Sequence, residues 1–326
     1  MASETQTLTF KTADYKTEAH NDWCPGCGDF GILNALQGAL AEMQLEPWRV
    51  ALFSGIGCSS KTPHFVRTYG IHTLHGRSLP FAAGAKLANP GLEVIAVGGD
   101  GDGYGIGVGH FVHAGRRNVD MAYIVFNNEV YGLTKGQASP TLKQGQQTKS
   151  LPLPNQQQGI NPLALALAAG YTFIARSYAF DQKHLRSTIA AAVRHRGMAL
   201  IDVLQPCPTY NDLHDKEFFG EEVEVEGRKV PRVYRLEEDQ YDGRVADPAD
   251  EREIQHKRRV AFERMTRQEE RVALGLFYQV RLPTYDERLA QVVPALARGG
   301  AAALSIADAS GRPTTDLSAL AREYLV

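Results

Sequence analysis

An aspartate between glycines and a later pair of asparagines are the residues of this chain best suited to hold a metal-bound phosphate group. They form Gly99-Asp100-Gly101 and Asn127-Asn128. Mg²⁺ prefers six oxygen ligands and takes few of them from the protein. The Asp100 carboxylate, the Asn128 amide oxygen and the carbonyl of Val130 could supply three. A lone Gly-Asp-Gly also makes an ordinary turn, but the pair of motifs predicts a diphosphate bridged by a divalent cation.

The four cysteines, Cys24, Cys27, Cys58 and Cys207, form a second candidate site. Soft thiolates suit zinc or an iron–sulfur cluster. Structural zinc sites more often use two close cysteine pairs, whereas this chain has one close pair and two separate cysteines. Cys24 and Cys207 are each followed by proline, as is one ligand of ferredoxin-type clusters. The spacing favours a cluster over zinc, and four unrelated buried thiols remain the third interpretation.

Alternating strands and helices are expected to position these residues. Apolar runs predict strands over 49–54, 93–97, 121–126, 171–176 and 199–204. Helical spacing predicts one helix from Asp29 and another from Ser78 to before Pro90, and each of these two residues can act as the cap of its helix. Further helices are predicted over 105–117, 162–169 and 181–196. The alternation predicts an α/β fold with a doubly wound, mostly parallel sheet covered on both faces.

The chemically important residues follow the predicted strands. Cys58, Asp100, Asn128 and Cys207 each lie within a few residues of a strand end. Ligands of open α/β sheets bind outside the carboxyl ends of the strands. We therefore expect these four residues to share one edge of the sheet.

The chain is predicted to have three parts: an N-terminal arm (1–20), a binding domain that carries the metal and thiol motifs (21–212) and a charged C-terminal extension (213–326). Within the extension, the charge-dense segment Glu251 to Arg271 predicts a solvated helix or an arm lying over a partner chain.

Composition excludes several classes of protein. Hydrophobic residues make up 43% of the chain and charged residues 22%, which is typical of a folded globular protein. Lys plus Arg number 35 against 37 Asp plus Glu, so there is no basic surplus for nucleic-acid binding. The longest apolar stretch, Leu163 to Ala169, is far shorter than the ~20 residues of a membrane helix. Residues 1–6 do not resemble a signal peptide, and we expect a cytoplasmic protein.

The motif around Asp100 resembles the diphosphate-binding signature of thiamine-diphosphate enzymes. Taken together, the motifs resemble the beta subunit of 2-oxoacid:ferredoxin oxidoreductases over about residues 20–210. The matching stretches are Trp23-Cys24-Pro25-Gly26-Cys27-Gly28, Gly57-Cys58-Ser59, His75-Gly76-Arg77, Gly99-Asp100-Gly101-Asp102, the run from Asn127 to Gln137, and Cys207-Pro208.

This resemblance implies three cofactor sites. The four cysteines would hold a [4Fe-4S] cluster, and Asp100, Asn128 and the carbonyl of Val130 would ligate Mg²⁺. Lys61 and Lys135 are candidates for binding the substrate carboxylate. Thiamine diphosphate would be contacted by Ile56, Gly57, Cys58, Ser59, His75, Gly76, Arg77, Gly101, Asp102, Gly132 and Leu133.

The implied reaction is oxidative decarboxylation of a 2-oxoacid with coenzyme A, giving acyl-CoA and CO₂ while electrons pass to ferredoxin. Thiamine diphosphate acts as an electron sink, and a nearby cluster can accept electrons one at a time. The Gly132–Lys135 stretch resembles broad-range or 2-oxoglutarate members of the family more than the large single-chain pyruvate enzymes, and this resemblance favours 2-oxoglutarate over pyruvate. A larger alpha chain would complete the enzyme, as a dimer of heterodimers. Two alternatives remain: a non-oxidative decarboxylase or synthase with structural zinc, and a non-catalytic electron-transfer subunit.

Overall fold

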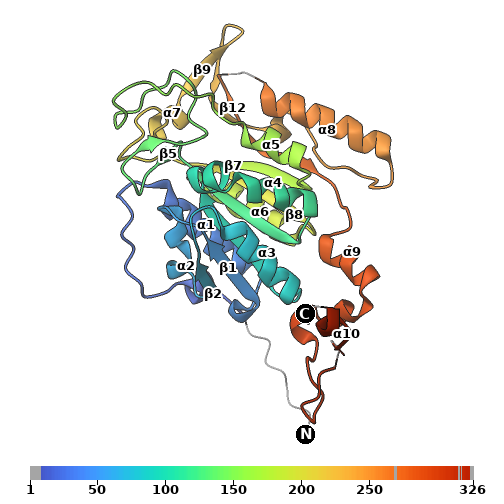
Figure 1. The fold of residues 1–326 in the computed structure, drawn as a ribbon. Helices are drawn as coiled ribbons and strands as arrows, with labels where there is room; N and C mark the ends of the chain where they lie inside the picture. Colours follow the sequence, from blue (N-terminus) through green and yellow to red (C-terminus); the bar gives the residue numbers. More distant parts are fainter. Residues whose placement is uncertain (1–8, 268–269, 315, 317, 324–326) are drawn as a thin grey trace.

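An eight-stranded sheet forms the centre of the fold (Figure 1). The computed structural model describes residues 9–267, 270–314, 316 and 318–323. In spatial order the strands are β11 (Val233–Arg235), β12 (Val272–Gln279), β7 (Phe173–Tyr178), β8 (Met198–Leu204), β4 (Met121–Asn127), β3 (Glu93–Gly99), β1 (Val50–Ser54) and β2 (Tyr69–His72).

The sheet is parallel from β2 to β7, and β12 joins β7 in the antiparallel sense. All residues of β1 and β4 are buried, because helices cover both faces of the sheet. The predicted doubly wound, mostly parallel α/β fold is therefore confirmed. The sequence analysis did not anticipate three strands, namely β2, β11 and β12.

Two hydrophobic cores lie on opposite faces of the sheet. Helices α1 (Gly28–Glu42) and α6 (Gln182–Arg194) pack together over one face, where Leu36 and Ile189 are fully buried. The other face carries α3 (Ser78–Ala88), α4 (Val108–Arg117), α5 (Pro162–Ala169) and α8 (Glu251–Thr266).

Shorter elements complete the described chain. A π-helical segment, Gly101–Ile106, precedes α4 where a single helix over 105–117 was expected. Apart from short 3-10 helices, the remaining helices and strands are α2 (Thr62–Phe65), α7 (Lys216–Gly220), α9 (Tyr285–Val292), α10 (Ser318–Glu323), the hairpin β5 (Val130–Tyr131) with β6 (Gln137–Ala138), and the hairpin β9 (Glu222–Val225) with β10 (Arg228–Pro231).

Neither predicted helix cap forms. The residue before α1 is Cys27, which makes no side-chain cap bond, and Asp29 lies fully buried in the first turn. The residue before α3 is Arg77, also without a cap bond, and Ser78 is the first helical residue. The prediction that Asp29 caps α1 is therefore wrong, because its carboxyl group faces the protein interior.

The N-terminal arm and part of the C-terminal extension pack against the sheet domain. In the expected arm, Tyr15 is fully buried and its hydroxyl donates to the carbonyl of Leu40 at 3.2 Å. The C-terminal extension supplies β11 and β12 to the main sheet, and α8 packs against α5 and β12. Residues Glu251–Thr266 of the charged segment therefore form a helix on the chain's own core, where Ile254 and Ala261 are buried. None of the helices in the described ranges is long and apolar enough to cross a membrane.

Candidate active site

The carboxyl ends of four neighbouring parallel strands bring the predicted site residues to one edge of the sheet. In the order β8, β4, β3 and β1, the segments that follow these strands carry Cys207, Asn128, Asp100 and Cys58. Since these strands lie side by side in register, the expected placement at one edge is confirmed.

A cavity of about 190 Å³ opens at this edge. Its lining residues are Ile56, Gly57, Cys58, Ser59, His75, Gly99, Asp100, Gly101, Asp102, Phe126, Asn128, Val130, Tyr131, Gly132, Leu133, Thr134 and Gln205. Every residue expected to contact thiamine diphosphate lines it except Gly76 and Arg77. The Gly76 N–H instead donates to Asp102 at 2.7 Å, and Arg77 precedes α3.

Asp100 is a buried carboxylate in a shell of donors. Its Oδ2 accepts from the Glu129 backbone N–H at 3.1 Å and from the hydroxyls of Ser139 and Thr141. Burial raises the pKa of Asp100 to about 7, although the two hydroxyls oppose that rise. A bound cation would replace the lost hydration and favour the charged form.

Asp102 joins the two loops that border the cavity. Its Oδ1 accepts from the backbone N–H of Ile56 at 2.9 Å, the N–H of Gly76 at 2.7 Å and Nδ1 of His75 at 2.9 Å. Its Oδ2 is buried and has no hydrogen-bond partner among the described residues. Burial raises the pKa of Asp102, so the site disfavours its charged form unless a ligand donates to it.

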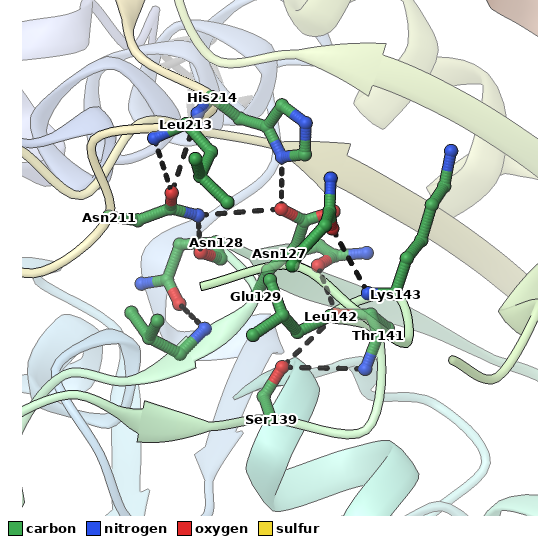
Figure 2. Close-up of polar contacts among 12 residues, drawn as sticks. Asn127, Asn128, Glu129, Ser139, Thr141, Leu142, Lys143, Asn211, Leu213 and His214 are labelled. Atoms are coloured by element: carbon green, nitrogen blue, oxygen red, sulfur yellow. Dashed lines mark hydrogen bonds and ion pairs between the residues drawn. The ribbon is translucent and has the colours of Figure 1, made fainter. Parts of the chain in front are cut away.

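The loop after β4 carries the other two proposed oxygen donors (Figure 2). The Asn128 Oδ1 accepts from the Val130 N–H at 3.1 Å, which bends the loop around Glu129. Glu129 has φ +64°, a left-handed conformation that is uncommon outside glycine. Its carboxylate accepts from Nδ1 of His214, which lies in the segment after Cys207.

The cysteines lie beside the cavity. An ideal Cβ on Gly132 would lie 3.3 Å from the Cys58 sulfur and 3.9 Å from the Cys207 sulfur. Burial raises the pKa of Cys58 to about 12 and also raises those of Cys27 and Cys207. Cys24 is exposed, and the Cys27 N–H donates to its carbonyl at 3.0 Å.

The buried thiols influence one another electrostatically. After burial and Asp29, which raise it most, Cys207 and Cys58 also raise the pKa of Cys27, so the three thiols lie within electrostatic range of one another. Nevertheless, within the described ranges no three His, Cys, Asp or Glu side chains converge closely enough to hold a single metal ion.

Asp29 is a buried carboxylate beside the thiols whose place the sequence does not predict. Its side chain is completely buried, and neither oxygen makes a well-formed hydrogen bond to a described residue. Burial raises its pKa to about 6, an effect that nearby Gln205 and Cys27 partly offset. Asp29 in turn raises the pKa of Cys58, so it lies within electrostatic range of the thiols. Its position two residues after Cys27 was the available signal, but it was interpreted as a helix cap.

The two candidate substrate lysines do not line the cavity. The Lys61 ammonium is 2.7 Å from Asp22, with the lysine side chain 30% exposed. Lys135 is exposed and has φ +81°, and it directly follows the lining residues Leu133 and Thr134. This chain alone therefore leaves both ammonium groups outside the cavity.

A larger cavity of about 820 Å³ shares Asn128 and Gln205 with the first. Glu129 and His214 line it together with basic residues such as Lys143 and Arg271. The Gln-rich and Pro-rich loop after Gly136 contributes part of its wall.

Two domain families match the chain. Residues 55–203 match the C-terminal TPP binding domain of thiamine pyrophosphate enzymes. Residues 207–293 match the C-terminal domain of the pyruvate ferredoxin oxidoreductase beta subunit.

Curated proteins extend the likeness to almost the whole chain. The 2-oxoacid:ferredoxin oxidoreductase subunit beta of Saccharolobus solfataricus is 54% identical over 94% of this chain and 97% of its own length. The 2-oxoglutarate oxidoreductase subunit KorB of Mycobacterium tuberculosis is 39% identical over 90% of this chain and 85% of its own.

A solved structure shares the fold. It is a 2-oxoglutarate:ferredoxin oxidoreductase from Magnetococcus marinus with 2-oxoglutarate, coenzyme A and succinyl-CoA bound. The TM-score is 0.80 and the identity 34%, over 99% of this chain and 98% of that chain.

Proposed function

The chain belongs to the beta subunits of the 2-oxoacid:ferredoxin oxidoreductases, and we propose that, with an alpha chain, it oxidatively decarboxylates a 2-oxoacid. In the balanced reaction, the 2-oxoacid, coenzyme A and two oxidised one-electron ferredoxins give acyl-CoA, CO₂, a proton and two reduced ferredoxins. Thiamine diphosphate would supply the electron sink for decarboxylation, and a [4Fe-4S] cluster would carry single electrons to ferredoxin.

The observation that carries this proposal is that one cavity is lined both by oxygen donors and by a cysteine. Asp100, Asn128 and Val130 lie on its wall together with Cys58. A decarboxylase without electron transfer has no need for thiols at this position. The shared cavity therefore supports an oxidative reaction.

The oxygen donors suit a diphosphate-bound Mg²⁺. We assign Asp100, the Asn128 amide oxygen and the Val130 carbonyl as its protein ligands. Asp100 is buried at 1% exposure, and its pKa is raised by burial, so an added cation would relieve an unfavourable environment. Three protein oxygens leave the other positions of an octahedral site to phosphate and water.

The thiols suit a cluster better than a single zinc ion. We assign Cys24, Cys27, Cys58 and Cys207 as its ligands. Structural zinc sites more often use two close cysteine pairs, whereas this chain has one close pair and two separate cysteines. A four-iron cluster places each thiolate on a different iron, so its ligands surround a cage. The absence of a side chain at Gly132 leaves room beside two of the sulfurs.

The remaining lining residues would hold the cofactor. Asp102 fixes His75 and the Ile56 N–H at the cavity wall, and its buried Oδ2 still lacks a donor. We propose that Ile56–Ser59, His75–Arg77, Gly101–Asp102 and Gly132–Leu133 contact thiamine diphosphate. Gly76 and Arg77 do not line the cavity, so they would act by fixing the backbone of the loop that carries His75.

We propose 2-oxoglutarate as the favoured substrate. The KorB relative from Mycobacterium tuberculosis is named as a 2-oxoglutarate oxidoreductase subunit, and the structure from Magnetococcus marinus holds 2-oxoglutarate. Lys61 or Lys135 would bind a substrate carboxylate after an alpha chain covers this edge of the sheet. Coenzyme A and ferredoxin would be the other reactants, and the extension after residue 212 would contact the alpha chain.

A co-purified complex of this chain with its alpha partner tests the proposal. We expect stoichiometric thiamine diphosphate, about four irons for each chain, and 2-oxoglutarate-dependent dye reduction that requires coenzyme A. Asp100→Ala should lose thiamine diphosphate, and Ala at any one of the four cysteines should lose iron. Asp120→Ala is the matched control, because Asp120 is another buried aspartate but pairs with Lys86 and Arg196 before β4.

Three results would contradict the proposal. Decarboxylation without dye reduction would indicate a non-oxidative enzyme. Iron without thiamine diphosphate would indicate an electron carrier. If Asp100→Ala kept its full cofactor content, Asp100 would not be a ligand of the metal.

A further inference from the structure

The segment after Cys207 folds back onto the loop that carries the proposed Mg²⁺ ligands. Asn211 lies at its turn and is 2% exposed. Its backbone N–H donates to the Cys207 carbonyl at 2.9 Å, and its side-chain Nδ2 donates to the Asn128 carbonyl at 3.0 Å. One buried residue therefore contacts both a proposed cluster ligand and a proposed metal ligand. Figure 2 shows its contact with Asn128.

We propose that Asn211 is a positioning residue that fixes the metal-binding loop relative to the cluster ligand Cys207. The inference rests on the proposed function, since it assumes that Cys207 and Asn128 hold cofactors. It adds a role for a residue in the segment that follows the thiamine-binding strands.

The pairing between β4 and β8 ends just before this link. Its last rungs are the register pair Asn127 and Leu204, followed by the Gln205 N–H that donates to the Asn127 carbonyl at 2.9 Å. Beyond that point the segments that follow the two strands separate, one toward Asn128 and the other toward Cys207. Asn211 joins them again by its side chain, where no backbone ladder remains.

The loop held by Asn211 has a conformation that needs support. Glu129, between the two proposed ligands Asn128 and Val130, has φ +64°. Its N–H donates to Asp100, and its carbonyl accepts from the Ser139 N–H at 3.1 Å. A left-handed residue without glycine's freedom persists only when its surroundings hold it.

Asn211 also holds the side chain of Glu129 through His214. The Asn211 Oδ1 accepts from the Leu213 N–H at 3.0 Å and the His214 N–H at 3.4 Å, which orders the turn that carries His214. The His214 ring then donates to the Glu129 carboxylate. The two halves of one amide thus have separate tasks: the oxygen orders the turn, and the nitrogen holds the metal loop.

This division gives a decisive variant. Asn211→Asp keeps the acceptor for Leu213 and His214 but puts an oxygen against both groups that accept from the amide nitrogen, the Asn128 carbonyl and the Glu129 carboxylate 3.4 Å away. In the co-purified complex we expect the concentration of thiamine diphosphate that half-saturates binding, at fixed Mg²⁺, to rise about tenfold, as is usual when a partner of a metal ligand is removed. Iron content should stay unchanged, because all four cysteines remain. Asn211→Ala should show the same rise with a lower melting temperature.

The control is Asn118→Ala. Asn118 is a comparably buried asparagine whose side chain also ties two segments, accepting from the Met198 N–H at 2.8 Å and donating to the Pro283 carbonyl at 3.2 Å. It should lower the melting temperature without changing thiamine-diphosphate binding. Binding unchanged in Asn211→Asp, or weakened equally by Asn118→Ala, would overturn the role of Asn211. A wild-type complex that binds no thiamine diphosphate would instead refute the proposed function.

Discussion

Nδ1 of His75 lies 2.9 Å from Oδ1 of Asp102, and the same oxygen accepts two backbone N–H groups. The contact joins the loop before α3 to the glycine-rich segment after β3. Asp102 is only 2% exposed, so water cannot replace these bonds. The wall of the smaller cavity therefore depends on one carboxylate.

Replacing that carboxylate should destabilise the protein in proportion to the donors left unpaired. Asp102→Ala leaves N–H groups of Ile56 and Gly76 without an acceptor, and we expect a loss of about 3 kcal/mol in the free energy of unfolding. Asp102→Asn retains an acceptor oxygen and should lose about 1 kcal/mol. Denaturant unfolding of both variants measures the difference, and equal losses would show that hydrogen bonding is not the cause.

Adding one methyl group at Gly132 tests how close the thiols lie to the cavity loop. In Gly132→Ala the new Cβ would be 3.3 Å from the Cys58 sulfur, a tighter contact than packed groups normally make. We expect a cost of about 1–3 kcal/mol in stability and reduced iron retention. Gly84→Ala, where nothing lies within 4 Å, is the control and should retain all its iron. Full iron retention in Gly132→Ala would place the cluster elsewhere.

His195 should make the fold sensitive to acid. Burial, together with Arg281, lowers its pKa to about 4, against the opposing influence of Asp120. In the unfolded chain His195 binds a proton near its ordinary pKa of about 6.5, whereas in the folded chain it binds one only near pH 4. The free energy of unfolding therefore falls as the pH drops from about 6.5 to 4. The full effect is about 3 kcal/mol. Its Nε2 also lies 2.9 Å from the Thr172 hydroxyl.

A neutral replacement separates this effect from general acid unfolding. His195→Gln should lose some stability at pH 7.5 but show a shallower decline between pH 6.5 and about 4, measured by urea unfolding across the pH range. Parallel curves for the variant and the wild type would mean that His195 does not titrate in this window.

The sequence predicted the residues whose signals are local. Apolar runs located β3 and β4, and so Asp100 and Asn128 could be placed after strand ends. The edge strand β2 has no such run because its residues Tyr69–His72 are all exposed. The strand β12 carries an apolar run that we did not interpret as a strand, and its place beside β7 depends on pairing between residues about a hundred positions apart.

The hydrogen bonds of Asn211 could not be predicted either, because they join distant parts of the sequence. Asn211 and Asn128 are 83 positions apart, and nothing in the composition near either residue indicates that contact. Asp29 was wrongly predicted from a local signal, because an acidic residue at the start of a helix usually acts as the helix cap. Its burial beside Cys27 became visible only when the strand ends and α1 were packed together.

The two substrate lysines should differ in which carboxylate they bind. If Lys135 binds the distal carboxylate, Lys135→Gln should raise KM roughly tenfold for 2-oxoglutarate alone. If Lys61 binds the carboxylate next to the oxo group, Lys61→Gln should raise KM for every 2-oxoacid. A panel of 2-oxoacids with the complete complex measures both. Lys229→Gln, on the exposed strand β10, is the control. Unchanged KM values would leave both as surface residues.

The isolated chain should be inactive even when fully loaded with cofactors. The only carboxylates among the described residues of the smaller cavity are Asp100, which we assign to Mg²⁺, and Asp102, whose Oδ1 already accepts three hydrogen bonds and which we place among the groups that fix the loops at the cavity wall. Thiamine activation needs a further carboxylate at the aminopyrimidine ring, which the resemblance assigns to a larger alpha chain. The described strands form one large sheet and two small hairpins, with no second α/β sheet that could supply it.

We therefore expect turnover by the isolated chain to be at least about a thousandfold below that of the complex, a loss within the range for missing acid–base catalysis. The measurement is 2-oxoglutarate-dependent dye reduction after iron and thiamine diphosphate contents have been matched. Adding purified alpha chain should restore activity, and light scattering should then show a dimer of heterodimers, because two-fold symmetry closes such an assembly. Substantial turnover by the loaded chain alone would place a complete active site within these 326 residues.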